Sequence, residues 1–429
     1  MPFSSLQVDH DRGPRALSRV LIIAPHGSYR TGPFIQAARQ QGAEVLIASQ
    51  GKHSIVSEYA RGLQINFSDE DQALQTIVTA AQERPFSGII GTDDSATVLA
   101  ARAAEQLGLP HNPPQAVQIA ARKDMARRCL SQSKVRIPDF RVLDIRRSLP
   151  EQLDGVVFPC VVKPVALSAS RGVIRVNDTQ QLSAAVERIK AILAAESQLP
   201  ADAGQTLLLE QFISGQEVAV EGMLYDGELD ILALFDKPDP MDGPFFEETY
   251  YITPSRLSVD IQLAIRDEVQ AACHAYGLRE GPVHAECRIN ADGVWILEVA
   301  ARTIGGLCGR LLTYGTGRQL EEVVLAHAQG RRVTVNQQDG AAGVLMIPIP
   351  GAGVLKRVEG LLAAQQIPGV EEVNIQIRDG YELIPLPEGG SYLGFIFARG
   401  ESSEEVERAL RKAHACLNIV IGPLWKVLV

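Results

Sequence analysis

A strand–turn–strand segment, VHAECRINADGVWILEVAAR at residues 283–302, places two glutamates where they could do chemistry together. Alternating apolar residues flank the turn, which predicts a hairpin with a three-residue loop and with Gly293 in the left-handed position of a bulge. In that register Glu286 lies directly opposite Glu298. The residues that share their face are His284 and Arg288. The residues predicted on the other, apolar face are Val283, Ala285, Cys287, Trp295, Leu297, Val299 and Ala301.

Two carboxylates paired across strands have Cβ atoms about 4.5 to 5.5 Å apart and repel each other. A cation must therefore offset their charge. Paired acids suit Mg²⁺, which keeps waters and phosphate oxygens as its remaining ligands. Alternatively, Arg288 or Arg302 neutralises the pair without a metal. The hairpin alone leaves both interpretations open.

A lysine lies in the apolar strand Val161–Pro164, directly before the small-residue loop ALSASRG. Burying the Lys163 ammonium is costly unless it meets an anion. A Ser/Gly loop that ends in Arg171 offers backbone donors and a guanidinium to phosphates. The alternative is an edge strand whose lysine reaches water, followed by a polar turn.

A third segment, LLLEQFI at 207–213, ends a strand with an acid, and Glu217 follows shortly after. Glu210 and Glu217 could accept hydrogen bonds from an adenine amino group and from ribose hydroxyls, with the backbone of Phe212 or Ile213 flanking the base. Acids at strand ends are also commonly solvated, so this segment alone does not establish a nucleotide site.

Taken in order, residues 116–310 resemble the ATP-grasp superfamily. Its pattern is a lysine in a helix, a lysine in a strand, a small-residue loop, an acid after a strand, and a Glu–hairpin–Glu unit that ends in Arg. The resemblance implies that Lys123 and Lys163 bind phosphates, and that a flexible loop with Ser168, Ser170, Arg171 and Gly172 covers the triphosphate. It also implies adenine contacts from Glu210, Phe212 and Ile213 and a ribose contact from Glu217. Glu286 and Glu298 would bind Mg²⁺ (or Mn²⁺), and Arg302 would contact the transferring phosphoryl. Ala300 stands where many members have Asn, so a second metal site would rest on Glu298, with Glu286 shared.

A narrower resemblance covers most of the chain. The segments FDKPDPMDGPFFEETYYITPSRL, HAE, EVAARTIGGLCGR and LPEGGSYLGFIFARG are similar to those of L-amino-acid ligases, the dipeptide synthetases related to carnosine synthase. This resemblance implies an ATP-dependent carboxylate–amine ligase that forms a peptide bond through an acyl phosphate. It makes His284, Arg302, Gly305 and Gly306 the candidates for contact with amino-acid substrates. The alternatives are an ATP-grasp enzyme that activates bicarbonate or formate, and a non-catalytic ATP-binding regulator.

The elements that must position these residues follow an α/β order with α+β modules. The predicted domains are a Rossmann-like unit at 1–115, an ATP-grasp core at 116–335 with a small lid module at about 156–222, and an α+β unit at 336–429. The last is predicted to run βαββαβ, with its first helix at Leu355–Gln366. Candidate lids are Ser168–Gly172 and Asp236–Thr249.

Three further features have no predicted role in catalysis or binding. The GSYRTG loop after the first strand lacks the GxGxxG spacing, so it does not predict a dinucleotide site. Asp93 and Asp94 are interpreted as helix-start acids, with substrate contact as the alternative. Lys237 is interpreted as a solvated loop lysine, with a substrate or phosphate contact as the alternative.

The composition argues against several classes of protein. The 429 residues are 46% hydrophobic and 21% charged, with a net charge of −10, which argues against disorder, nucleic-acid coating and binding to anionic membranes. Six scattered cysteines without a CxxC pair indicate reduced thiols in the cytoplasm. The acidic start MPFSSLQVDHDRG lacks the apolar run of a secretory signal. The expected partners are small-molecule amino acids, and a homodimer is a possible assembly.

Overall fold

The computed structural model describes residues 18–424 apart from 51–60, 197–198, 201 and 337–338. The N-terminal arm, where the sequence predicts no secretory signal, lies outside this part. The described elements form four sheets. Among the described helices, none has the length and apolar character needed to span a membrane.

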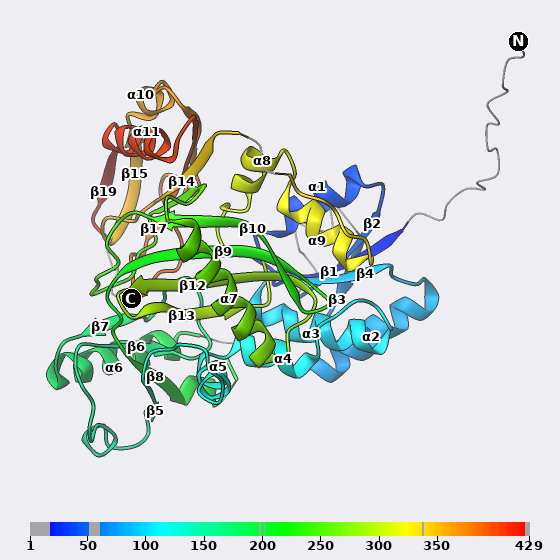
Figure 1. Ribbon diagram of the computed structural model, residues 1–429, viewed down its shortest axis with the longest axis horizontal. Coiled ribbons are helices and arrows are strands. Elements are labelled where there is room, and N and C mark those ends of the chain that lie inside the picture. The colour runs from blue at the N-terminus through cyan, green and yellow to red at the C-terminus, as the bar shows by residue number, and fades with distance from the viewer. Residues whose placement is uncertain (1–17, 51–60, 197–198, 201, 337–338, 425–429) are drawn as a thin grey trace, which may run out of the picture.

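The N-terminal part is a parallel sheet in the order β3-β2-β1-β4 (Figure 1). Its elements are β1 (Arg19–Ile23), α1 (Thr31–Gln40), β2 (Glu44–Ser49), β3 (Arg61–Gln64), α2 (Glu70–Glu83), β4 (Gly88–Gly91) and α3 (Asp94–Gln106). Alternate residues of β1 pack into two different apolar clusters, one with α1 and one with α2 and α3. The sheet is therefore covered on both faces, which is why its strands are short apolar runs.

Two short helices, α4 (Pro114–Ala121) and α5 (Lys123–Leu130), lead into a small antiparallel sheet in the order β5-β8-β6-β7. Its elements are β5 (Phe140–Asp144), β6 (Cys160–Pro164), β7 (Ile174–Val176), α6 (Thr179–Ala194) and β8 (Thr206–Gln211), with short 3₁₀ turns at Pro150–Gln152 and Ala203–Gln205. The apolar side of α6 packs on this sheet. The small-residue loop joins β6 to β7.

The largest sheet has eight strands in the order β13-β12-β9-β10-β11-β14-β18-β16. The strands are β9 (Gln216–Tyr225), β10 (Glu228–Lys237), β11 (Tyr250–Thr253), β12 (Gly281–Asn290), β13 (Gly293–Ala300), β14 (Ala341–Ile347), β16 (Val370–Ile375) and β18 (Gly394–Gly400). The associated helices are α7 (Val259–Tyr276), α8 (Arg310–Thr316), α9 (Leu320–Ala328) and α11 (Ser403–Ala415). The sheet crosses the predicted boundary between residues 335 and 336, since β11 pairs with β14.

A fourth sheet, β17-β15-β19, completes the C-terminal part. Its elements are β15 (Gly353–Glu359), α10 (Leu361–Gln365), β17 (Glu382–Leu383) and β19 (Asn418–Gly422). The predicted βαββαβ order is present, with β15 and β17 as additional strands. The predicted helix Leu355–Gln366 is wrong in its first half. Gly360 separates strand from helix at φ +84°, where an added Cβ would lie 1.9 Å from the Cys416 carbonyl oxygen.

One apolar cluster joins the N-terminal sheet to the large sheet. It includes Ile22 and Phe34 from the first and Phe235, Tyr251 and Phe397 from the second, all at most 2% exposed. The two sheets therefore share a core rather than forming separate units, and the loops at their junction are held in place by packing.

Candidate active site

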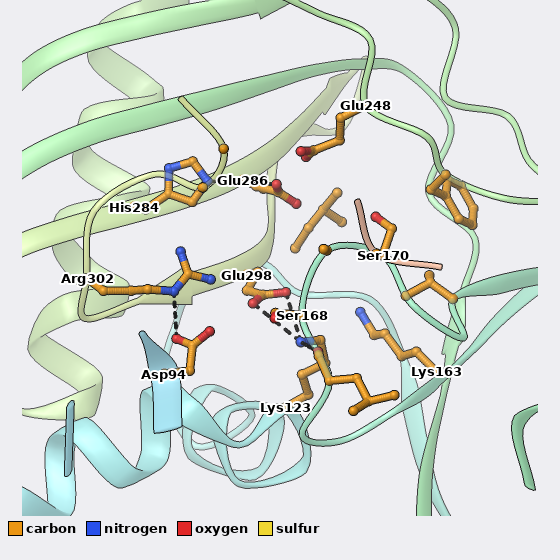
Figure 2. Close-up of a pocket in the computed structure, with 18 of the residues that line it drawn as sticks. Asp94, Lys123, Lys163, Ser168, Ser170, Glu248, His284, Glu286, Glu298 and Arg302 are labelled. Carbon is orange, nitrogen blue, oxygen red and sulfur yellow. Dashed lines mark hydrogen bonds and ion pairs between the residues drawn. The ribbon is translucent and has the colours of Figure 1, made fainter. Parts of the chain in front are cut away.

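The sequence-predicted site residues come together in one cavity of about 640 Å³ (Figure 2). It is lined by loops of the N-terminal sheet, by the small sheet and by the large sheet. The predicted residues that line it are Lys123, Lys163, Ser168, Ser170, Glu210, Phe212, Ile213, Glu217, His284, Glu286, Glu298, Arg302, Gly305 and Gly306. Arg171 and Gly172 belong to the same predicted loop but do not line the cavity.

The glutamate hairpin has the predicted central pairing but a different bulge. Glu286 lies opposite Glu298, as predicted, whereas Asn290 pairs with Gly293 across a two-residue turn. The register shifts after Glu286, so Leu297 is the extra residue. Side chains between the bulge and the turn therefore change face. Val294 and Ile296 enter the apolar core, and Leu297 lines the cavity, so the predicted apolar positions of Trp295 and Leu297 are wrong.

Lysines, rather than arginines, lie beside the two glutamates. Lys123 Nζ lies 3.2 Å from Glu298, and Lys237 Nζ lies 3.2 Å from Glu286. Arg288 and Arg302, the arginines expected to neutralise the pair, are instead bound to Glu217 and Asp94. That alternative is therefore wrong for the residues described here.

Lys237 is the centre of a buried carboxylate cluster. Its Nζ lies 2.8 Å from Glu217 and 2.7 Å from Glu248, besides its contact with Glu286. Burial opposes the charge, but the three carboxylates hold the pKa of Lys237 well above its ordinary value. The interpretation of Lys237 as a solvated loop residue is wrong, because β10 continues two residues beyond its predicted end and pairs Lys237 with Glu217 of β9.

A divalent metal fits the two paired glutamates. Their side chains are 24% and 32% exposed, compared with 6% for Glu217, so Glu286 and Glu298 keep oxygens accessible from the cavity. Carboxylate oxygens are ligands that Mg²⁺ and Mn²⁺ prefer. The oxygens of Glu217, Glu248 and Glu286 lie within 4.8 Å of one another, but the Lys237 ammonium already bridges them.

A second buried cluster lies at the other side of the cavity. Glu210 is 3% exposed and lies 2.6 Å from Arg127 Nε and 2.5 Å from Lys163 Nζ. Burial opposes ionisation, yet Arg127 and Lys163 lower the pKa of Glu210. Lys163 is therefore buried against an anion, and the alternative in which its side chain reaches water is wrong.

Phe212 lies between two guanidinium groups. Arg175 is 4.0 Å and Arg288 is 5.0 Å from its ring centroid. Arg288 also donates to Glu217 at 2.9 Å, to the Ile213 carbonyl at 2.6 Å and to the Met241 carbonyl. Arg288 thus connects Glu217 to the backbone of Ile213, which the resemblance places at adenine.

The small-residue loop is bound to a distant C-terminal segment. The Gly172 amide donates to the Pro387 carbonyl at 2.9 Å, and Arg171 Nε donates to the Glu388 carbonyl at 3.1 Å. The Glu388 carboxylate pairs with Arg188 of α6 at 2.5 and 2.8 Å. Arg171 therefore faces away from the phosphates it was expected to bind, and its role there stays a prediction.

Arg302 meets an acid from the N-terminal sheet. Its Nε donates to Asp94 at 2.8 Å, and Figure 2 shows this pair on the opposite side of Glu298 from Lys163. Burial opposes ionisation, but Arg302 lowers the pKa of Asp94. Asp93 accepts from the Ser28 and Thr92 hydroxyls and makes no side-chain cap bond. Both acids lie at the start of α3, as predicted, but the Asp93 side chain does not cap the helix and Asp94 binds Arg302.

His284 is oriented by a glutamate that the sequence analysis did not identify. Glu221 of β9 is 1% exposed, lies opposite His284, and approaches its Nδ1 at 3.2 Å. The same carboxylate accepts from the Ile304 amide at 3.0 Å. Burial disfavours the imidazolium, but Glu221 and Glu286 raise the pKa of His284 to about 9. Glu217 and Glu221 share a strand face at even spacing, which was the signal available in the sequence.

Two further lining residues come from the GSYRTG loop. Tyr29 Oη accepts a hydrogen bond from the Gly306 amide at 2.6 Å, and Arg30 is buried at 9% exposure. The sequence did not indicate a role for Tyr29 and Arg30, because their loop lacks the glycine spacing of a dinucleotide motif. The loop nevertheless reaches the site from the neighbouring sheet.

Three family models match separate parts of the chain. An ATP-grasp N-terminal domain matches residues 35–111, an ATP-grasp domain matches 156–310, and an L-amino acid ligase C-terminal domain 2 matches 345–422.

The similar proteins point to the same class. The crystal structure of L-amino acid ligase from Bacillus licheniformis has a TM-score of 0.78 and 28% identity, over 94% of this chain and 99% of that one. Carnosine synthase 1 of Gallus gallus is 28% identical over 72% of this chain, and alanine–anticapsin ligase of Bacillus subtilis is 27% identical over 55%. The chain spans about a third of the length of the first and about half of the second.

The chain has the fold of the ATP-grasp superfamily, and the ATP-grasp domain model matches its residues 156–310. Within it, the chain resembles the L-amino-acid ligases, which confirms the resemblance seen in the sequence.

Proposed function

We propose that the chain is an ATP-dependent carboxylate–amine ligase that joins two amino acids by a peptide bond. The observation that supports this proposal is that one cavity contains the lysines predicted to bind phosphate, the two paired glutamates and the Arg302–Asp94 pair. The likeness to L-amino acid ligase over nearly the whole chain supports amino acids as the substrates.

In this proposal the nucleotide lies between the small and large sheets. Lys123, Lys163, Ser168 and Ser170 contact the phosphates, and Glu217 contacts the ribose. The adenine contacts come from Glu210, Phe212 and Ile213. Glu210 and Glu217 already have two cationic partners each, so they accept from the nucleotide as fixed, ionised groups rather than as mobile side chains.

The metal ligands in this proposal are Glu286 and Glu298. A bound Mg²⁺ or Mn²⁺ supplies charge neutralisation for the phosphoryl being transferred. Lys123 holds the Glu298 carboxylate and His284 lies 3.9 Å from Glu286, so both carboxylates are restrained before any ligand binds.

The reaction proceeds in two displacements. The carboxylate oxygen of one amino acid attacks the γ-phosphorus of ATP, and ADP leaves. The amine of the second amino acid then attacks the acyl carbon, the bond to the phosphate oxygen breaks, and the departing phosphate takes up the proton that the amine loses. Arg302 donates to the acyl carboxylate and the γ-phosphoryl as charge develops between them. Asp94 at Nε and the Thr303 carbonyl at Nη1 hold Arg302 in place, and its Nη2 donates to the substrate.

Water must be kept from the acyl phosphate, because it would hydrolyse the intermediate. The small-residue loop covers one side of the cavity and is bound to the Pro387–Glu388 segment. Phe246 and Glu248 of the Asp236–Thr249 segment line another side.

The test is ADP release from MgATP, measured with single and paired amino acids. We expect release that requires two amino acids, a dipeptide by mass spectrometry, and a hydroxamate when hydroxylamine replaces the amine. Release that depends on bicarbonate, or ATP binding without turnover, would contradict the proposal. The domain boundary at 115, the cytoplasmic location and a homodimer are proposed alongside this function, whereas the large sheet continues across the boundary predicted at 335.

A further inference from the structure

The cavity has a further cationic group beside Gly305. Arg30 precedes α1, lines the cavity and is 9% exposed. Its Nη1 donates to the Thr92 carbonyl at 2.5 Å. Its Nε is buried and has no hydrogen-bond partner in the described part of the chain. A buried guanidinium cannot discharge by losing its proton, so a guanidinium that lines a cavity, with Nη2 beside Gly305, favours an anionic ligand.

The acids near Arg30 do not satisfy it. The Asp93 Oδ1 atom lies 3.9 Å from Arg30, beyond hydrogen-bond distance, and Asp93 Oδ2 already accepts from two hydroxyls. Asp94 is bound to Arg302. Among the described residues, the Arg30 charge is therefore only partly compensated.

The space beside Arg30 is kept open by the glycine turn. A Cβ built on Gly305 would lie 3.5 Å from Arg30 Nη2 and 3.8 Å from Tyr29 Oη, with no nearer atom. Tyr29 Oη accepts from the Gly306 amide, which leaves its O–H group free to donate. A guanidinium and a phenol hydroxyl thus converge beside a residue without a side chain.

We infer that Arg30 and Tyr29 bind the free α-carboxylate of the amine-side amino acid. This inference rests on the proposed function and adds the subsite of one substrate. The carboxylate to be activated must reach the γ-phosphoryl beside Lys123 and Glu298, whereas Arg30 lies at the Thr92 carbonyl and beside Gly305. The carboxylate of the amine-side amino acid keeps its charge throughout the reaction, and Arg30 provides a permanent cation for it.

The test compares two amine donors that differ only in this group. They are L-alanine and L-alaninamide, or the same pair built on the amino acid that supports the fastest ADP release. The wild-type chain should show a KM at least about tenfold lower for the acid than for the amide. Arg30→Gln should raise the KM for the acid about 10- to 100-fold and change that for the amide less than about threefold. The KM for ATP should not change.

Two variants complete the design. Tyr29→Phe should raise the acid KM several-fold with no effect on the amide. Arg102→Gln, a part-exposed arginine of α3 that pairs with Glu70 and Asp71, is the matched control and should leave both KM values unchanged. Because each variant is compared by its acid-to-amide ratio, the intrinsic difference in amine reactivity cancels.

Each outcome decides a different claim. A wild-type chain that uses the amide as well as the acid overturns the subsite without any variant, even if Arg30→Gln fails to fold. An unchanged acid-to-amide ratio in folded Arg30→Gln overturns it too. Absence of ADP release with every amino-acid pair overturns both the proposed function and the subsite. ADP release without a preference for the acid over the amide overturns the subsite alone.

Discussion

The acids that face the cavity already have cations of the chain beside them. Lys123 holds Glu298, Lys237 holds Glu286 and Glu248, and Arg302 holds Asp94. Such pairing restrains the side chains before ligands arrive, which is how a site for phosphoryl transfer achieves positioning. Removal of one residue of such an ion pair leaves the charge of the other uncompensated. Some single substitutions should therefore lower kcat, and others should lower the free energy of unfolding.

Glu298→Gln should lower kcat by at least about 10²-fold and leave the fold intact, because it removes a metal-binding charge from a part-exposed position. The measurement is amino-acid-dependent ADP release as a function of Mg²⁺ concentration, with Glu372→Gln, outside the cavity, as control. Near wild-type activity at limiting Mg²⁺ would remove Glu298 from the metal site.

Arg302→Lys should lower kcat about 10²- to 10³-fold with little change in ATP affinity. The lysine keeps the charge but cannot bind Asp94 and the reacting groups together through a planar fork. ADP release and calorimetry with ATP measure the two effects, and Arg310→Lys is the matched control. If Arg302→Lys retains most of kcat, the phosphoryl contact assigned to this residue is wrong.

Lys237→Met should lower the free energy of unfolding by about 3 kcal/mol, because it leaves the buried Glu217 and the part-buried Glu248 and Glu286 without their shared ammonium. Urea unfolding measures this loss, with the exposed Lys190→Met as control. Without nucleotide, Mn²⁺ should raise the melting temperature of this variant more than that of the wild type, since the cluster then lacks its own cation. Equal shifts would argue against a freed cation site.

At the scale of elements, the small-residue loop depends on a segment more than 200 residues away. Arg171 and Gly172 bind backbone oxygens of Pro387 and Glu388, and the Glu388 side chain pairs with Arg188 on α6. The C-terminal part therefore closes over the lid module. Arg188 and Glu388 are both more than 40% exposed, so the pair is screened by solvent and its effect on stability is small.

Glu388→Ala should raise the KM for ATP about two- to fivefold and increase the ratio of ADP to dipeptide, because a loosened loop admits water to the intermediate. Both products are quantified in the same reaction. Glu187→Ala, on the same helix but paired with Lys190, should change neither quantity. An unchanged product ratio in Glu388→Ala would mean that this contact does not control loop closure.

At the scale of the whole molecule, the cavity exists because the N-terminal sheet and the large sheet share a core. Phe34 of α1 is 2% exposed within that cluster, close along the chain to Tyr29 and Arg30. The packing that stabilises the chain therefore also sets where the loop of α1 meets the Gly305–Gly306 turn.

Phe34→Ala should lower the free energy of unfolding by about 3 to 5 kcal/mol, as expected for removal of a buried aromatic side chain. Guanidinium unfolding provides the measurement. Leu263→Ala, 42% exposed on α7, should change the free energy by less than about 0.5 kcal/mol. A small effect at Phe34 would mean that the two sheets are not energetically coupled there.

The sequence by itself determined the local parts of the site. Strand periodicity put Glu286 and Glu298 on one face, and the order of lysine, small-residue loop and acid indicated the superfamily, whereas the direct pairing of the glutamates results from a two-residue turn together with the bulge at Leu297. These features depend on neighbouring residues, whose geometry is set by φ and ψ preferences and by a period of two. The bulge at Leu297 was not predicted, because no residue type in that strand requires one.

Only the tertiary structure decided which distant groups meet. Lys237 entered the carboxylate cluster through a strand that runs longer than its pattern, Asp94 met Arg302 across the junction of two sheets, and Tyr29 and Arg30 reached the glycine turn from a loop that matches no motif. Each of these contacts joins segments that share no local periodicity. Their distances follow from how the sheets pack, and packing is a property of the complete core rather than of any one segment.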